Sequence, residues 1–88
     1  MRARAVVMFN RYMAKKVLLV EDDPDMREVL RRQLSAEGYA VKTCDNGMDV
    51  LPALYDYRPE LMIMDVMLPG RDGISLLSAI TREGGSKL

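Results

Sequence analysis

Two short apolar runs, each followed by acidic residues, are the most regular feature of the sequence. The runs cover residues 16–20 and 61–64. Neither run alternates apolar with polar positions, and such continuous runs are typical of strands that a parallel sheet buries on both faces. A weaker strand is predicted for residues 39–44, with Val41 and Cys44 as its buried contacts. The pattern therefore predicts a sheet of three strands with the two apolar runs at its centre.

Between the first two predicted strands, apolar residues recur at helical spacing from Met26 to Leu34. This spacing predicts an amphipathic helix. Asp23 suits the N-cap and Pro24 the first helical position, because the fixed φ and missing N–H of proline are tolerated there. Gly38 is expected directly after the helix, at the position that favours glycine.

Two further helices are predicted, one over residues 48–57 and one from residue 74 to the glycine pair at 84–85. Pro52 would remove a hydrogen bond from the middle of the first of them, so we expect either a kink or a later start. Strands and helices then alternate along the chain. Such alternation predicts an α/β fold in which helices connect parallel strands by crossovers.

The composition excludes several classes of site. The 88 residues form one small domain at most, and 13 basic residues balance 13 acidic ones, with a net charge of −3 from residue 13 onward. A nucleic-acid-binding surface would instead show clustered Lys and Arg. The sequence has no histidine and one cysteine, which excludes an internal disulfide, zinc sites and histidine-based catalysis. We expect Cys44 to be a buried packing residue, the alternative being a reactive thiol.

A single cysteine suits a reducing cytosol, so we expect a cytoplasmic protein. No apolar run approaches the roughly 20 residues of a membrane span, so we expect no membrane contact. Residues 1–14 show neither turn signals nor a clear period of apolar positions. Met13 lies shortly before the first predicted strand, where a translation start would be expected. We therefore interpret residues 1–14 as an N-terminal extension and residues 15–88 as a partial domain. A disordered tail is the expected form of the extension, and a membrane or partner anchor is the alternative.

Both apolar runs end in acids: Glu21, Asp22 and Asp23 follow the first run, and Asp65 follows the second. The carboxyl ends of parallel strands meet at one edge of a sheet, where α/β folds bind ligands, so we expect Asp22, Asp23 and Asp65 to lie together. A hard divalent cation such as Mg²⁺ would relieve their repulsion, because it binds a few carboxylates together with water and phosphate oxygens. Alternatively, Asp23 caps the helix and Asp65 is a solvated acid at a strand end.

The loop after Asp65 contains Pro69, Gly70 and Gly73, which favour tight turns that can approach a ligand closely. An aspartate is also a competent nucleophile toward phosphorus and can form an aspartyl phosphate. Phosphoryl transfer requires mainly positioning and charge neutralisation, which a cation beside Asp65 would supply. These features favour phosphoryl chemistry at Asp65.

Three stretches resemble the receiver domain of bacterial two-component response regulators: VLLVEDDP at residues 17–24, the predicted turn DNG at residues 45–47 and LMIMDVMLPGRDG at residues 61–73. The resemblance covers residues 15 to about 83. It implies a flavodoxin-like, three-layer α/β/α fold with Asp65 as the phosphoacceptor and a histidine kinase or phosphotransfer protein as the phosphoryl donor. It also implies that Mg²⁺ is held directly by Asp23 and Asp65, through water by Asp22, and by the backbone carbonyl of Met67.

The resemblance also implies what should be missing. The family's sheet has five strands in the order 2-1-3-4-5, whereas the pattern here provides three, so we expect a partial sheet of order 2-1-3. The family's Ser or Thr at the end of strand four and its Lys at the end of strand five would be absent. Ser86 and Lys87 are poor substitutes for these residues, because they follow a glycine pair and no strand is predicted to position them. Residues 61–64 would then form an exposed edge strand, through which we expect self-association or capture by a partner's sheet.

These features favour a phosphoacceptor module that is not an enzyme. The alternative is a truncated receiver fragment that does not signal and acts as an interaction or competitor module. A metal-dependent phosphatase fits poorly, because that family requires a second Asp two residues after the first and Met67 occupies this position. Direct binding of nucleic acid is not expected.

Overall fold

The computed structural model of the chain describes residues 4–9 and 15–65, and the helix expected after Gly73 lies outside these ranges. The described elements are β1 (Arg4–Met8), β2 (Lys16–Val20), α1 (Pro24–Ala36), β3 (Ala40–Cys44), the 3-10 turn η1 (Gly47–Asp49), α2 (Val50–Tyr57) and β4 (Leu61–Asp65). All elements predicted within these ranges are present, and β1 is additional. Neither described helix is long and apolar enough to span a membrane.

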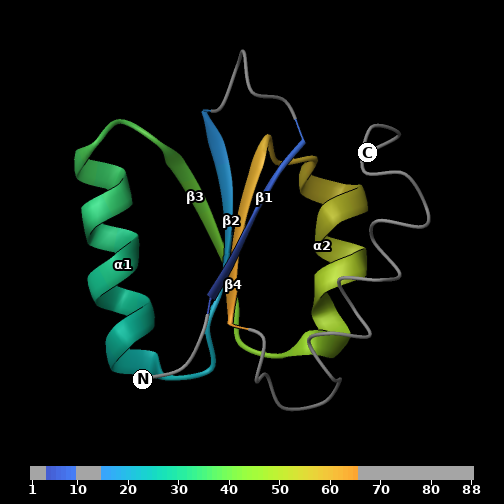
Figure 1. Ribbon diagram of the computed structural model, residues 1–88, viewed down its shortest axis with the longest axis horizontal. Helices are drawn as coiled ribbons and strands as arrows, with labels where there is room; N and C mark the ends of the chain where they lie inside the picture. The colour runs from blue at the N-terminus through green and yellow to red at the C-terminus, as the bar shows by residue number, and fades with distance from the viewer. Residues whose placement is uncertain (1–3, 10–14, 66–88) are drawn as a thin grey trace.

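The strands form one sheet of order β1-β4-β2-β3 (Figure 1). β2 pairs in parallel with β3 on one side and with β4 on the other, whereas β1 pairs with β4 in the antiparallel direction. The predicted order 2-1-3 is confirmed as β3-β2-β4. The two apolar runs form β2 and β4, each of which has a neighbouring strand on both sides. Their position inside the sheet explains why their side chains are buried without alternation.

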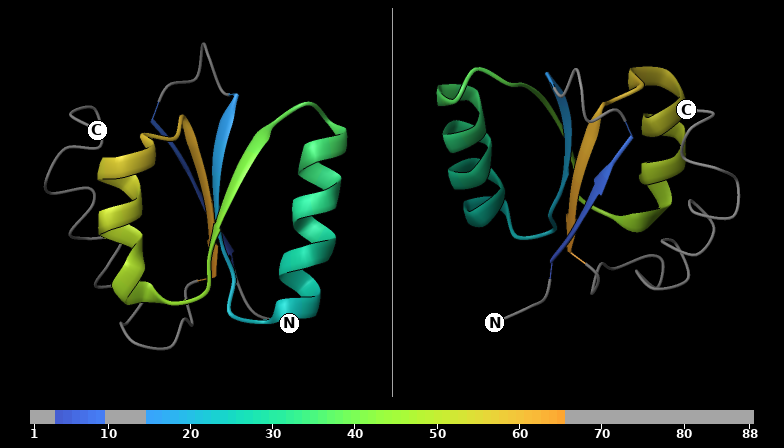
Figure 2. Two further views of the ribbon diagram at one scale, coloured as in Figure 1. Left: turned by 180° about the vertical axis from the view of Figure 1, so that it is seen from behind. Right: turned by 45° about the horizontal axis from the view of Figure 1, so that its top comes forward.

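The helices lie on opposite faces of the sheet, α1 on one and α2 on the other (Figure 1 and Figure 2). This three-layer α/β/α arrangement is the flavodoxin-like fold that was predicted. The main core lies between the sheet and α2, where the side chains from both layers are at most 1% exposed: Leu18, Val20, Met62 and Met64 from the sheet, Val50 and Leu54 from α2.

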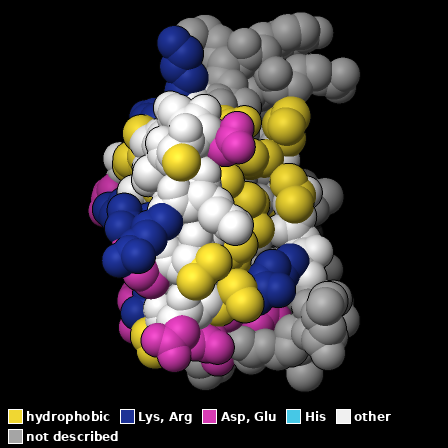
Figure 3. Space-filling model, turned by 90° about the vertical axis from the view of Figure 1, so that its left-hand side faces the viewer, with side chains coloured by type: hydrophobic (Ala, Val, Ile, Leu, Met, Phe, Trp, Pro, Cys, Tyr) yellow, Lys and Arg dark blue, Asp and Glu magenta, His cyan; other side chains and the backbone are white. Residues whose placement is uncertain are grey.

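The opposite face of the sheet, beneath α1, is covered less completely. Helix α1 contains no fully buried residue, and Met26 and Val29 are 38% and 49% exposed. A groove of about 450 Å³ lies between α1 and the sheet, and Leu30, Leu34 and Ile63 are among its lining residues. Figure 3 views the molecule from the α1 side and shows hydrophobic side chains at the surface beside charged ones. The two helices therefore contribute unequally to the core.

Helix α1 begins and ends as its sequence predicts. The Oδ1 atom of Asp23 accepts hydrogen bonds from the backbone N–H groups of Asp25 at 2.9 Å and Met26 at 3.4 Å. Pro24 is the first helical residue, and Gly38 follows the helix with a φ of 99°. This left-handed conformation is accessible to glycine without a steric penalty, so Gly38 ends the helix.

Helix α2 starts later than residue 48, which resolves the problem posed by Pro52. The side chain of Asn46 caps η1 by accepting a hydrogen bond from the N–H of Asp49 at 3.1 Å, and α2 begins only at Val50. Pro52 therefore lies in the first turn, where backbone N–H groups have no partner within the helix. Of the two alternatives, the later start is correct.

Strand β1 is not the disordered segment that we expected. It pairs with β4 so that Ala5 lies opposite Met64 and Val7 opposite Met62, and Val7 and Phe9 pack against the core on the α2 side. The alternate residues of β1 are exposed. The expectation of disorder was wrong for this segment because its pairing partner is distant in the sequence, and local patterns do not reveal such pairing.

Strand β1 also covers the edge of β4 that we expected to be exposed. Beyond the ladder, the N–H of Phe9 donates a hydrogen bond to the carbonyl of Glu60 at 2.7 Å. The expectation that residues 61–64 form a bare edge is therefore wrong for the described residues, and self-association, which was inferred from that edge, stays a prediction. Among the described strands, β1 is the outer one on this side, and its Val6 and Met8 are 63% and 52% exposed.

Cys44 is buried at the end of β3, as the packing interpretation predicted. Burial raises the pKa of its thiol, because the thiolate would lose hydration, and the nearby carboxylate of Asp49 raises it further. A raised pKa keeps the sulfur protonated and poorly nucleophilic. This environment is that of a packing residue.

Candidate metal and phosphoacceptor site

The carboxyl ends of β2 and β4 lie side by side, because Val20 is paired with Met64 in the parallel register. Glu21, which directly follows β2, and Asp65, which ends β4, therefore lie at the same edge of the sheet. Together with Asp22 they form the acid cluster: each of the three offers a carboxylate oxygen, and these oxygens lie within 4.8 Å of one another. The expected gathering of carboxylates at this edge is present in the structure.

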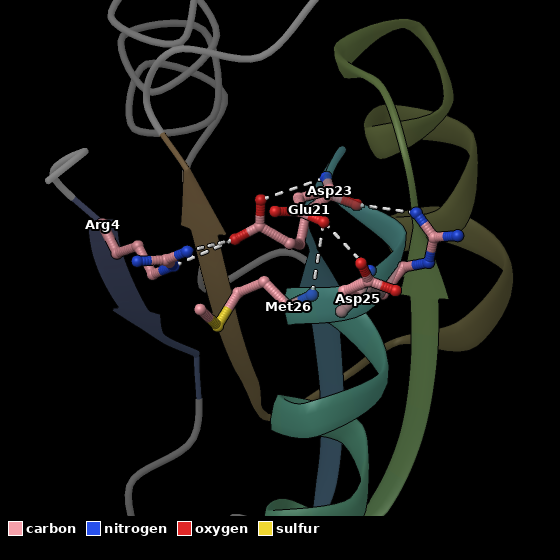
Figure 4. A network of polar contacts seen from close by, with 6 residues as sticks. Arg4, Glu21, Asp23, Asp25 and Met26 are labelled. Atoms are coloured by element: carbon pink, nitrogen blue, oxygen red, sulfur yellow. Dashed lines mark hydrogen bonds and ion pairs between the residues drawn. The ribbon is translucent and has the colours of Figure 1, made fainter.

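Two members of the acid cluster are fully buried, since Glu21 and Asp65 are both 0% exposed. The Oε1 atom of Glu21 accepts hydrogen bonds from Nε of Arg4, at 3.1 Å, and from its Nη2 (Figure 4). The Oε2 atom accepts one from the backbone N–H of Asp23 at 3.3 Å. A buried carboxylate requires such partners, because it has lost its hydration.

Asp23 does not belong to the acid cluster, although we expected it to hold the metal directly. Its Oδ1 atom faces the first turn of α1 and accepts the two capping hydrogen bonds (Figure 4). The physical reason is the proline that follows: Pro24 starts the helix, so the residue before it becomes the N-cap. Glu21, two residues earlier in the acidic stretch, is the third member of the acid cluster instead.

The alternative interpretation of the acids is therefore half correct. Asp23 does cap the helix, but Asp65 is buried beside two other carboxylates and is not a solvated strand end. Pro24 already indicated that the side chain of Asp23 would cap the helix. With Asp23 used in this way, Glu21 could have been assigned to the cluster from the sequence. Met67 and the loop residues Pro69, Gly70 and Gly73 lie outside the described residues.

The three members of the cluster fit a hard divalent cation. Their donors are all carboxylate oxygens, and Mg²⁺ prefers oxygen ligands, usually one or two carboxylates completed by water or phosphate. The arrangement also brings like charges together in a poorly hydrated place, which is unfavourable unless a positive charge is near. Arg4 provides part of that charge within the described residues.

The sheet order and the acids at its carboxyl edge define a flavodoxin-like receiver fold. Residues 17–87 match the family model of the response regulator receiver domain. The chain belongs to this family, whose members are signalling modules of two-component systems.

Solved receiver structures resemble the chain closely. The chemotaxis response regulator CheY4 of Vibrio cholerae has a TM-score of 0.77 and 28% sequence identity, covering 86% of this chain and 63% of that one. The response regulator TrrA of Thermotoga maritima, in complex with Mg²⁺-BeF, has a TM-score of 0.74 and 33% identity, covering 80% and 61%. The signal receiver domain of a protein described as a Luxo repressor, from Vibrio parahaemolyticus, has a TM-score of 0.76 and 26% identity, covering 84% and 57%. The chain thus spans less than two thirds of each of these structures.

Proposed function

We propose that the chain accepts a phosphoryl group on Asp65 from a histidine kinase or phosphotransfer protein, with Mg²⁺ held by Glu21, Asp22 and Asp65. The observation that carries this proposal is the position of Asp65. It is fixed at the end of a central strand, fully buried, with two other carboxylates close enough to share one cation. The complex of the related TrrA with Mg²⁺-BeF supports the choice of metal.

The proposed reaction is a substitution at phosphorus. A carboxylate oxygen of Asp65 attacks the phosphoryl group of a phosphohistidine, the new P–O bond forms, and the P–N bond breaks as the imidazole leaves with its electron pair and takes up a proton. When bound, Mg²⁺ would neutralise negative charge on the phosphoryl oxygens. Strand β4 keeps the attacking oxygen in place, so little positional freedom is lost on reaction.

Intact mass spectrometry after incubation with Mg²⁺ and acetyl phosphate tests the proposal. We expect one phosphoryl adduct in the wild-type chain and none in Asp65→Asn. Asp56→Asn is the matched control, because Asp56 is an exposed acid on α2 and should leave the adduct unchanged. An adduct that persists in Asp65→Asn, or one that forms equally well without a divalent cation, would contradict the assignment.

A second candidate function is an interaction module that binds a kinase or another sheet without accepting phosphate. The exposed side chains of Val6 and Met8 on the outer strand of the sheet favour it, because apolar edge strands can pair with a partner's strand. In this case the wild-type chain would bind its partner but yield no adduct with acetyl phosphate, and Asp65→Asn would bind equally well.

A further inference from the structure

Arg4 connects the N-terminal strand to the acid cluster. It is the first residue of β1, it lies opposite Asp65 in the antiparallel register, and its guanidinium reaches across to Glu21 (Figure 4). The side chain of Arg4 is 29% exposed, whereas that of Glu21 is 0% exposed. A positive charge that helps to balance Glu21 therefore comes from a segment that lies before residue 17, where the match to the family model begins.

Two nitrogens of one guanidinium bind the same oxygen, Oε1 of Glu21. A divalent cation shared by the cluster would need oxygens from the same carboxylates. It would also bring two positive charges close to the positive charge of Arg4. Both effects act in the same direction, because the cation and Arg4 compete for one negative partner and repel each other.

We propose that Arg4 is a resident counter-ion that competes with the divalent cation for Glu21, so that β1 is docked most tightly when the metal is absent. This inference rests on the metal site of the proposed function. Thermodynamic linkage makes the competition reciprocal. The free energy by which Arg4 weakens metal binding equals the free energy by which the bound metal weakens the docking of β1. The N-terminal strand thereby sets the metal concentration at which the site is filled.

The effect on β1 should be graded along the strand. At the start of β1, the ladder with β4 is supplemented by the contact of Arg4 with Glu21, whereas Val7 and Phe9 further along also pack against the core. Loss of the ion pair should therefore loosen the Arg4 end of β1 and leave the Phe9 end in place. This gradient distinguishes the competition from a general change in stability.

Calorimetric titration with Mg²⁺ tests the first half of the proposal. Arg4→Gln should bind Mg²⁺ at least about fivefold more tightly than wild type, the lower end of typical couplings between linked sites. Arg4→Lys keeps the charge but loses the forked geometry, so its affinity should lie between the two. Arg32→Gln is the matched control, because it removes an exposed arginine that pairs with Glu28 on α1, and it should bind as wild type does.

Hydrogen exchange of the β1 amides, followed by NMR in the wild-type chain during a Mg²⁺ titration, tests the second half without any substitution. We expect exchange at the Arg4 end to accelerate as the site fills, and exchange near Phe9 to change little. Equal Mg²⁺ affinity in wild type and Arg4→Gln, or β1 protection that is unchanged at saturating Mg²⁺, would overturn the competition while leaving the metal site intact. Failure of every variant to bind Mg²⁺ would instead overturn the metal site of the proposed function, and the competition with it.

Discussion

Neighbouring acids in the Glu21–Asp23 stretch have different roles that follow from their surroundings. Glu21 is buried at the end of β2, where its oxygens are bound by Arg4 and by a backbone N–H. Asp23 is exposed, and its oxygen stabilises the first turn of α1. Helix caps contribute roughly 0.5–2 kcal/mol, and Asn caps about as well as Asp. Charge and capping at position 23 can therefore be separated by a single substitution.

Glu28 on α1 gives the chain a specific response to acid. Hydrogen bonds from Arg31 and Arg32 lower the pKa of its carboxyl from 4.5 to about 2. Because the folded-state pKa lies below that of the unfolded chain, the stabilisation is present above about pH 4.5 and is lost as the pH falls toward 2. The effect should be small, since the group is exposed to solvent.

We therefore expect Glu28→Gln to lose less stability than wild type on acidification. Urea unfolding, followed by circular dichroism at several pH values through this range, measures the difference. Parallel pH profiles for the two chains would show that the ion pairs with Arg31 and Arg32 contribute nothing to folding.

At the scale of elements, α2 should stabilise the fold far more than α1. Leu54 on α2 is 0% exposed in the main core, whereas Leu30 on α1 lines the open groove. Leu54→Ala should lower the free energy of unfolding by about 3 kcal/mol, within the usual range for buried leucines. Leu30→Ala should lower it by only about 1 kcal/mol, because less apolar surface is lost. Urea denaturation compares the two directly, and equal losses would contradict the unequal packing of the helices.

Most elements could be predicted because their signals are local. The apolar runs of β2 and β4, the capping pair Asp23–Pro24 and the terminal Gly38 each act within a few residues. Strand β1 could not be placed in this way, because it is stabilised by pairing with β4 and by the burial of Val7 and Phe9 against distant residues. The apolar stretch from Ala5 to Phe9 was a signal for a strand, but nothing local indicated its partner.

At the scale of the whole molecule, the N-terminal segment adds a strand to the described sheet. β1 pairs with the edge of β4, and Val7 and Phe9 pack against the core. A chain starting at Met13 should lose this cover and expose an apolar edge strand, which favours pairing with a second copy. We expect sedimentation velocity to show a larger species for the shortened chain than for the full one at equal concentration. If both chains sedimented as the same oligomeric species, β1 would not be what protects this edge.

The candidate site was predicted in outline, with Asp22 and Asp65 as members, but its third member was not predicted. Strand order placed Asp65 at the correct edge with acids beside it, because the carboxyl ends of parallel strands coincide. The choice between Glu21 and Asp23 depended on where the helix begins, and Pro24 determines that. The hydrogen bonds from Arg4 to Glu21 could not be predicted either, because they require β1 to pair with β4.

The central claim, that Glu21 and not Asp23 belongs with Asp22 and Asp65 at the metal site, is tested most directly by a matched pair of neutral substitutions. Mg²⁺ affinity is measured by calorimetry for Glu21→Gln and Asp23→Asn, each of which removes one negative charge while keeping a side chain of similar shape. We expect Asp23→Asn to bind Mg²⁺ nearly as wild type does, with its helix cap intact. Glu21→Gln should bind about tenfold more weakly or worse, the size typical for loss of a group that ligates or orients a metal. The reverse order, with Asp23→Asn impaired and Glu21→Gln unaffected, would contradict the account.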